Sequence, residues 1–156
     1  MAHVNPLFAP TDEKSAAAAL RVTIARIYRA LRLSTTSGIT PSQISVLFRV
    51  EQSEPVRMGV LAHLERITPA TLSKVIDSLE ALDLVEREPD PLDGRVTLIR
   101  VSTTGRRLIE TQRAASTRAL EMALAKMEGA KRELLLESLP ALEDLSEILL
   151  AHGEGA

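Results

Sequence analysis

The stretch ITPATLSKVIDSLEALDLVER at Ile67–Arg87 decides the fold of this chain, together with DGRVTLIRVSTTG at Asp93–Gly105. Thr68 is placed to cap a helix whose first residue is Pro69, where a missing N–H costs no hydrogen bond. The apolar residues that follow recur at helical spacing, as Leu72, Val75, Ile76, Leu79 and Leu82. The stretch therefore predicts a short amphipathic helix that starts at a tight turn.

Two short strands are predicted after this helix. The first is Leu84–Glu88 and the second is Val96–Val101, which is rich in β-branched residues. The intervening PDPLDGR contains an Asp-Gly pair and two prolines, which mark a hairpin loop. Another short helix, from Met58 to Leu64, precedes the tight turn. Two short helices, a tight turn and a hairpin in this order are typical of a winged helix-turn-helix.

Long helical segments flank this unit. The predicted fold is mainly α with a small β-hairpin wing, a winged helix-turn-helix domain flanked by long dimerisation helices. We expect a flexible lead-in at 1–10, an N-terminal dimerisation helix at 11–38, the winged helix-turn-helix domain at 39–102 and C-terminal dimerisation helices at 103–152. Thr11 should cap the first helix, with Asp12 and Glu13 in its first turn, and Gly38 should end it. Ser102 should cap the long helix that starts at about residue 103. Pro140 should kink or split the helix at 131–151, whose leucines need a partner unless the arms pack together within a monomer.

Composition limits the classes of function. The chain has 19 basic and 21 acidic residues, so binding of nucleic acid through bulk positive charge is excluded. Cysteine is absent, which excludes disulfides, zinc–thiolate sites and thiol catalysis. Three scattered histidines predict no metal site, and no catalytic constellation is legible, so we expect neither a cofactor nor an enzyme. No segment approaches the roughly 20 apolar residues that cross a bilayer, and no signal peptide is recognisable, so a cytoplasmic protein is expected.

The exposed face of the helix at 69–81 carries small and hydroxylic residues with one cation. Small side chains let a helix approach the floor of a DNA groove, and its positive dipole end favours phosphate. Lys74 can reach a phosphate or the edge of a guanine. The alternative is an ordinary solvated face, but the adjacent turn and hairpin favour DNA. The DNA-binding candidates here are Thr68, Pro69, Ala70, Thr71, Ser73, Lys74, Asp77 and Ser78.

The hairpin supplies a second group of DNA-binding candidates. Arg95 can insert its guanidinium into the narrow minor groove, where the negative potential is deepest. Asp93 is expected to hold that guanidinium through a charge-assisted pair. Arg87 and Arg100 on the strands are candidates for phosphate contacts. The alternative for these residues is a surface ion pair of little energetic worth.

Taken together, these residues closely resemble the multiple antibiotic resistance regulator (MarR) family. The resemblance rests on the capped helix and first strand at Ile67–Arg87, the Asp-x-Arg wing at Asp93–Arg95 and the start of the next helix. Asp83 stands where the family usually has glycine, which requires a residue that tolerates the left-handed conformation. Val101-Ser102 stands where Leu-Thr is usual. The order of helices matches the family over nearly the whole chain.

The resemblance implies a homodimeric, sequence-specific transcriptional regulator, a repressor that a small aromatic or phenolic acid releases from DNA. Two recognition helices would enter successive major grooves about 34–36 Å apart, so a roughly palindromic operator in double-stranded DNA is expected. An effector would act by favouring the wrong separation of these helices. An arginine would pair with its carboxylate, and ordinary packing or surface roles are the alternative. The effector-binding candidates are Tyr28, Arg32, Arg49 and Arg113.

A second function stays open, a winged-helix module that binds another protein and has no operator of its own. Residues 57–107 carry eight basic and eight acidic side chains, which gives this region no net attraction to DNA. Salt dependence separates the two functions, because a DNA-binding protein loses affinity steeply as salt rises. The absence of cysteine also excludes the oxidant-sensing branch of the family.

Overall fold

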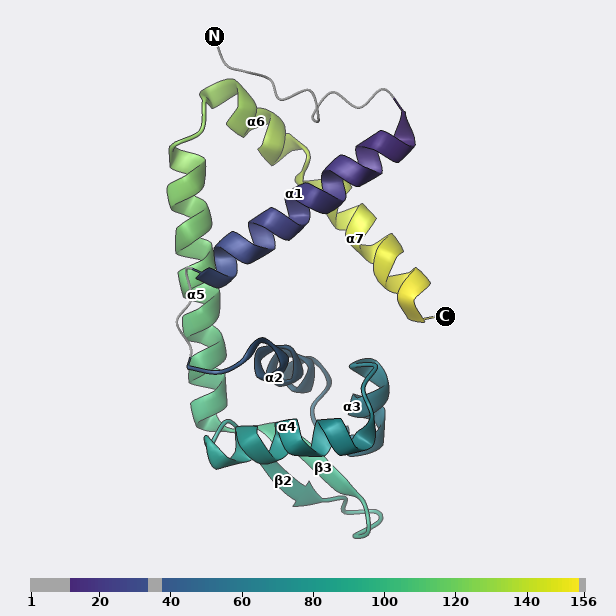
Figure 1. Ribbon diagram of the computed structural model, residues 1–156. Helices are drawn as coiled ribbons and strands as arrows, with labels where there is room; N and C mark the ends of the chain where they lie inside the picture. Colours follow the sequence, from purple (N-terminus) through teal and green to yellow (C-terminus); the bar gives the residue numbers. More distant parts are fainter. Residues whose placement is uncertain (1–11, 34–37, 155–156) are drawn as a thin grey trace. The chain divides into compact units, whose positions relative to one another are not determined.

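The computed structural model describes residues 12–33 and 38–154 (Figure 1). The chain forms two compact units, Met1–Ser116 and Thr117–Ala156, and each is described here by itself. The predicted lead-in at residues 1–10 lies outside the described residues, as does Thr11. Within the described parts, no helix is long and apolar enough to cross a membrane.

Helix α1 (Glu13–Leu33) is capped by a residue other than the expected one. The Asp12 carboxylate accepts a hydrogen bond from the main-chain N–H of Ser15 at 2.7 Å, and Ser15 Oγ accepts from the Asp12 N–H at 3.3 Å. The Ser15 N–H also lowers the pKa of Asp12 from its usual value. Asp12 was expected inside the first turn, so its place at the N-cap is a correction by one residue.

The helix-turn-helix contains three helices, and the first of them begins at a capping residue. Helix α2 (Pro41–Ser53) begins at Thr40, whose side chain and Gln43 form a reciprocal capping box. Strand β1 (Val56–Arg57), helix α3 (Met58–Leu64) and helix α4 (Pro69–Ala81) come next. Thr68 caps α4 and Pro69 is its first residue, as the sequence predicts. The main chain turns between α3 and α4 through Arg66, which has a positive φ of 53°.

The wing is a three-stranded antiparallel sheet rather than a two-stranded hairpin. Strands β2 (Val85–Pro89) and β3 (Thr97–Val101) pair along their whole length, and β1 pairs with the other side of β3. The two residues of β1 were not predicted, because a strand this short has no readable periodicity. The fold class is confirmed, with one strand added to the wing.

One hydrophobic core joins these helices and the sheet. Its members come from α2, α3, α4, all three strands and the start of α5 (Thr103–Ala125). The side chains that are fully buried or nearly so include Leu47, Val50, Leu61, Leu72, Ile76, Leu79, Ile99 and Ile109. Leu82 was expected on the buried side of α4, but it lies at the C-cap and is 48% exposed. It follows the last helical residue, so the helical period no longer sets its direction.

The start of α5 is fixed to the wing through Ser102. The Gly105 N–H donates to Ser102 Oγ at 2.9 Å, which is the N-cap bond that the sequence predicts. Ser102 Oγ in turn donates to the carbonyl oxygen of Asp83. Asp83 has a φ of 56°, so it adopts the left-handed conformation expected where the family has glycine. The entry into α5 is therefore tied to the exit from α4.

The second unit contains the end of α5 and two further helices. Helix α6 (Gly129–Glu137) and helix α7 (Leu139–Glu154) are separated at Ser138, and Pro140 is the second residue of α7. Of the two outcomes expected from Pro140, the structure shows the split. Many leucines of these helices are exposed within this chain, among them Leu134, Leu136, Leu139, Leu149 and Leu150.

Candidate nucleic-acid interface

The N-terminal end of α4 is an exposed turn of small and hydroxylic residues. The Thr71 N–H donates to Thr68 Oγ1 at 3.2 Å, and the two hydroxyl oxygens lie 2.8 Å apart. Thr68, Pro69, Ala70 and Thr71 are all exposed. This end of the helix therefore offers hydroxyls and a partial positive charge without a bulky side chain in the way.

One turn further along, Lys74 provides the only cation on α4. It is exposed, and no carboxylate in the described part of the chain pairs with it. Ser73 beside it is partly buried. The charge of Lys74 is thus available on the exposed face of α4, and its contact with a phosphate or a base edge stays a prediction.

Ser78 has a different position from the one expected. Its Oγ donates to the carbonyl oxygen of Val75 at 2.7 Å and accepts from Gln43 Nε2 at 2.9 Å. Because Gln43 belongs to α2, these bonds hold Ser78 at the contact between α2 and α4. Its hydroxyl therefore connects two helices of the domain rather than facing solvent.

Arg87 on β2 is held by two acids of α4. Its Nη1 lies 2.8 Å from Glu80 Oε2, and its Nη2 pairs with Asp77 Oδ1. Both Asp77 and Arg87 were expected to face DNA, and the structure pairs them with each other. The two carboxylates are stabilised by one guanidinium, so with Lys74 these four side chains carry no net charge. The pairing also ties the wing to α4.

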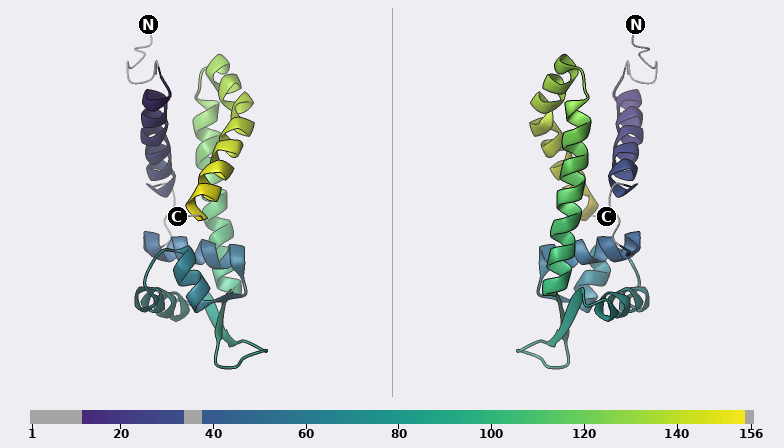
Figure 2. Two further views of the ribbon diagram at one scale, coloured as in Figure 1. Left: turned by 90° about the vertical axis from the view of Figure 1, so that its right-hand side faces the viewer. Right: turned by 90° about the vertical axis from the view of Figure 1, so that its left-hand side faces the viewer.

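The loop between β2 and β3 extends away from the helices of this unit (Figure 2). Asp90 N donates to the Val96 carbonyl at 2.8 Å, which closes the loop at its base. Asp93 Oδ1 accepts from the main-chain N–H of Arg95 at 3.1 Å, so Asp93 fixes the loop backbone rather than the expected guanidinium. The Arg95 side chain is exposed and has no ion-pair partner among the described residues.

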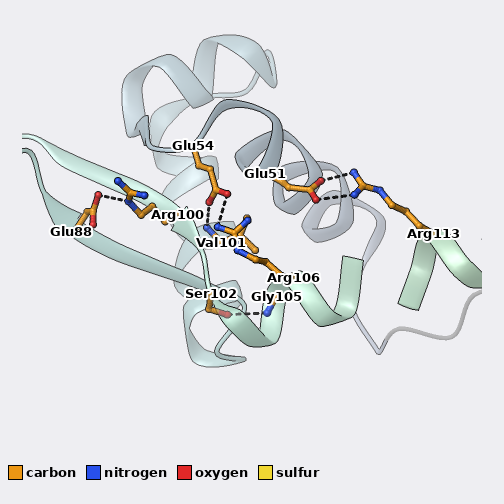
Figure 3. A network of polar contacts seen from close by, with 9 residues as sticks. All are labelled: Glu51, Glu54, Glu88, Arg100, Val101, Ser102, Gly105, Arg106 and Arg113. Carbon is orange, nitrogen blue, oxygen red and sulfur yellow. Dashed lines mark hydrogen bonds and ion pairs between the residues drawn. The ribbon is translucent and has the colours of Figure 1, made fainter. Parts of the chain in front are cut away.

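Arg100 was expected to contact a phosphate, and it pairs with Glu88 across β2 and β3 (Figure 3). This carboxylate raises the pKa of Arg100 above its usual value. Both side chains are about half exposed, so the pair adds little to stability.

A network that the sequence did not reveal fixes the sheet to α2 and α5. Glu54 is 14% exposed, its Oε2 accepts from the Val101 N–H at 2.7 Å, and its Oε1 pairs with Arg106 at 2.6 Å (Figure 3). The residues in contact are 47 and more positions apart, so no local pattern could have shown them. These bonds attach the end of β3 and the start of α5 to the end of α2.

Two effector candidates, Arg49 and Arg113, have carboxylate partners within the first compact unit, Met1–Ser116. Arg113 makes a two-pronged ion pair with Glu51 at 2.9 and 2.7 Å, and its guanidinium lies 5.6 Å from the centre of the Phe48 ring. Arg49 Nε lies 3.2 Å from Glu65 Oε1. Each arginine therefore already neutralises an acid of its own domain.

The other two candidates, Tyr28 and Arg32, lie together on α1. The Arg32 guanidinium is 5.9 Å from the centre of the Tyr28 ring. Described residues Tyr28, Arg29, Arg32 and Leu33 line a shallow hollow of about 370 Å³. An aromatic ring and two guanidinium groups are a chemically suitable lining for an aromatic acid.

Helix-turn-helix, wing and exposed Lys74 and Arg95 together define a winged-helix DNA-binding protein. The family model described as MarR family matches residues 39–97. An uncharacterised HTH-type transcriptional regulator of Mycobacterium leprae is 32% identical over 127 residues, which covers 81% of this chain and 89% of that protein. The chain belongs to the MarR family of transcriptional regulators.

Solved structures support the same fold over most of the chain. A transcriptional regulator from Pseudomonas aeruginosa is 29% identical, with a TM-score of 0.76 over 88% of this chain and 98% of that one. A variant of S. aureus MepR, solved bound to an oligodeoxyribonucleotide, has a TM-score of 0.65 over 85% of this chain and 97% of its own, at 19% identity.

Proposed function

We propose that this MarR-family regulator is a homodimeric repressor that places α4 in the major groove of its operator and Arg95 in the adjacent minor groove. The observation that carries this proposal is the pair of exposed cations Lys74 and Arg95, neither of which has a carboxylate partner among residues 12–33 and 38–154. Arg87, Arg100 and Arg106, on or beside the same sheet, each pair with a protein carboxylate. The oligonucleotide bound to the MepR variant supports this use of the fold.

The exposed leucines of α6 and α7 support dimerisation. Leu134, Leu149 and Leu150 are 68%, 61% and 66% exposed, which leaves apolar surface uncovered on two consecutive helices. A second copy of the chain is the partner we propose for them. Two-fold symmetry then predicts a roughly palindromic operator with half-sites about one helical turn apart.

For the effector, we propose a small aromatic acid that contacts Tyr28 and Arg32 on α1. The carboxylate would pair with the guanidinium, and the ring would lie against Tyr28. The acid would release DNA by binding the dimer better when its recognition helices are wrongly spaced.

Titration of the purified chain against duplexes from its own promoter region, at several salt concentrations, tests the DNA-binding proposal. Lys74→Ala and Arg95→Ala should each weaken binding and each reduce the slope of log K against log salt by about one. Arg118→Ala is the matched control, because it removes the same charge from an exposed position on the second unit that has no ion pair with any described residue. Equal effects of all three substitutions would show that only net charge matters.

A protein-binding module is the second candidate function. The observation in its favour is that four arginines on or beside the sheet already pair with acids, namely Arg57, Arg87, Arg100 and Arg106. This function predicts that no duplex binds even at low salt. It also predicts that Arg95→Ala leaves the result of the duplex titration unchanged. A footprint that persists at low salt and fades as salt rises would exclude it.

A further inference from the structure

An ion pair between Arg57 and Asp90 joins the base of the loop between β2 and β3 to the residue that precedes α3. Arg57 Nη2 lies 2.7 Å from Asp90 Oδ2. Arg57 is the last residue of β1 and directly precedes α3, while Asp90 directly follows β2. The pair therefore connects two segments that are 33 residues apart in the chain.

Asp90 is unusual because it is a charged residue that is only 6% exposed. Both of its carboxylate oxygens are used, Oδ2 by Arg57 and Oδ1 by the Leu92 N–H at 2.9 Å. Its own N–H donates to the Val96 carbonyl, which closes the loop. A buried carboxylate that loses a partner is costly, so the bonds of Asp90 favour one conformation of the wing.

The residues at the tip of the wing depend on this arrangement. Leu92, whose N–H Asp90 holds, is 92% exposed, and Arg95 follows three positions later. On the other side, Arg57 pairs with Leu98 in β3 and leads into α3, which packs against α4. One ion pair thus connects the wing tip to the helix pair that carries Lys74.

We propose that Arg57 and Asp90 are positioning residues for DNA recognition, which fix the wing relative to α4 so that Arg95 and Lys74 meet the operator as one preformed surface. This inference rests on the proposed DNA-binding function. Pre-ordering of the wing lowers the conformational entropy that binding must remove, so loss of the pair weakens binding although neither residue touches DNA.

The sign of the effect separates positioning from charge. Asp90→Asn removes a negative charge near a polyanion, which by itself should tighten DNA binding. Positioning predicts the opposite, a loss of about tenfold. Glu88→Gln is the matched control, because it removes a carboxylate from the neighbouring Arg100 pair and should leave binding unchanged or slightly tighter. Binding by Asp90→Asn that equals or exceeds that of Glu88→Gln would overturn the proposal.

A double-mutant cycle with Arg95→Ala tests whether the pair acts through the wing. If it does, Asp90→Asn has much less effect once Arg95 is absent, and footprint protection is lost at the flanks while the centre stays protected. A general loss of folding would instead add in full to the effect of Arg95→Ala. Full additivity would therefore contradict the positioning role.

Measurement on the free protein separates this inference from the proposed function. Backbone ¹⁵N relaxation of residues 92–95 should show increased motion in Asp90→Asn and no change in Glu88→Gln. If the unmodified protein binds no duplex at low salt, the proposed function fails, and the relaxation data still decide whether the pair orders the wing. Unchanged order in Asp90→Asn would overturn the inference even if DNA binding is found.

Discussion

At the scale of single residues, Gly105 is the glycine with the least room for a side chain among those in the described part of the chain. A Cβ on Gly105 would lie 2.1 Å from the carbonyl oxygen of Leu84 and 2.8 Å from Val101 Cγ1. Because the first contact is with backbone, the start of α5 would have to move away from the sheet.

We expect Gly105→Ala to lower the free energy of unfolding by about 2–3 kcal/mol, at the upper end of the usual cost of overpacking. Urea unfolding followed by circular dichroism measures the change. Gly129→Ala is the control, since nothing lies within 4 Å of a Cβ at Gly129, and it should be neutral or slightly stabilising. Equal stability of the two variants would contradict the close approach at Gly105.

The change of the free energy of unfolding at acidic pH should depend on Asp90. The Leu92 N–H, with the Arg57 guanidinium, holds the pKa of Asp90 below its usual value of 3.8. A lowered pKa in the folded state contributes stability above the unfolded value, and this contribution is lost as pH falls through the folded value. The stability difference between the unmodified protein and Asp90→Asn should therefore shrink below pH 3.8. Urea unfolding at a series of acidic pH values measures it, and a difference that does not change with pH would contradict this assignment.

At the scale of helices and strands, local sequence signals were sufficient to predict where helices begin. Thr68 and Pro69 predicted the first residue of α4, and Ser102 predicted the start of α5, because a cap and its helix lie within four residues of each other. Strand β1 was missed because its pairing with β3 spans about 40 residues. Contacts such as Glu54 to Val101 and Arg57 to Asp90 are equally non-local, so sequence periodicity carries no trace of them.

For the candidate interface, the structure shows which of the predicted residues are exposed and which are bonded within the protein, and DNA contact by any of them stays a prediction. The sequence identified Lys74 and Arg95, whose side chains the structure leaves exposed. It also proposed Arg87 and Ser78 as contacts, but tertiary packing pairs Arg87 with Asp77 and Glu80 and places Ser78 against Gln43. Residue type shows what a side chain can bond, whereas the fold decides which partner reaches it first.

The cap of α4 can be tested as an element. Thr68→Ala removes the acceptor for the Thr71 N–H and should lower the free energy of unfolding by about 1 kcal/mol. Thr68→Ser keeps the hydroxyl and should stay within about 0.5 kcal/mol of the unmodified protein. Thermal unfolding compares the two, and a serine variant as unstable as the alanine variant would show that the methyl group matters rather than the cap.

On the scale of the whole molecule, the exposed leucines predict a concentration-dependent assembly. Leu149→Glu should shift the protein from dimer to monomer in sedimentation velocity, because it places a charge on apolar surface that a partner would cover. Leu92→Glu is the control, since Leu92 is even more exposed but lies on the wing. A monomeric unmodified protein, or dissociation by both variants, would contradict dimerisation through α7.

The ion pairs of Arg57, Arg87, Arg100 and Arg106 have a consequence for how the proposed repressor would search a genome. Residence on non-operator DNA comes from charge alone, and here these four arginines already pair with protein carboxylates before any DNA arrives. Encounters with random sequence should therefore be brief, and relatively few copies should be held away from the operator by competing sites. Because fewer cations remain for phosphates, occupancy of the operator should depend on DNA shape and base identity. Operator variants should therefore be discriminated most sharply near physiological salt.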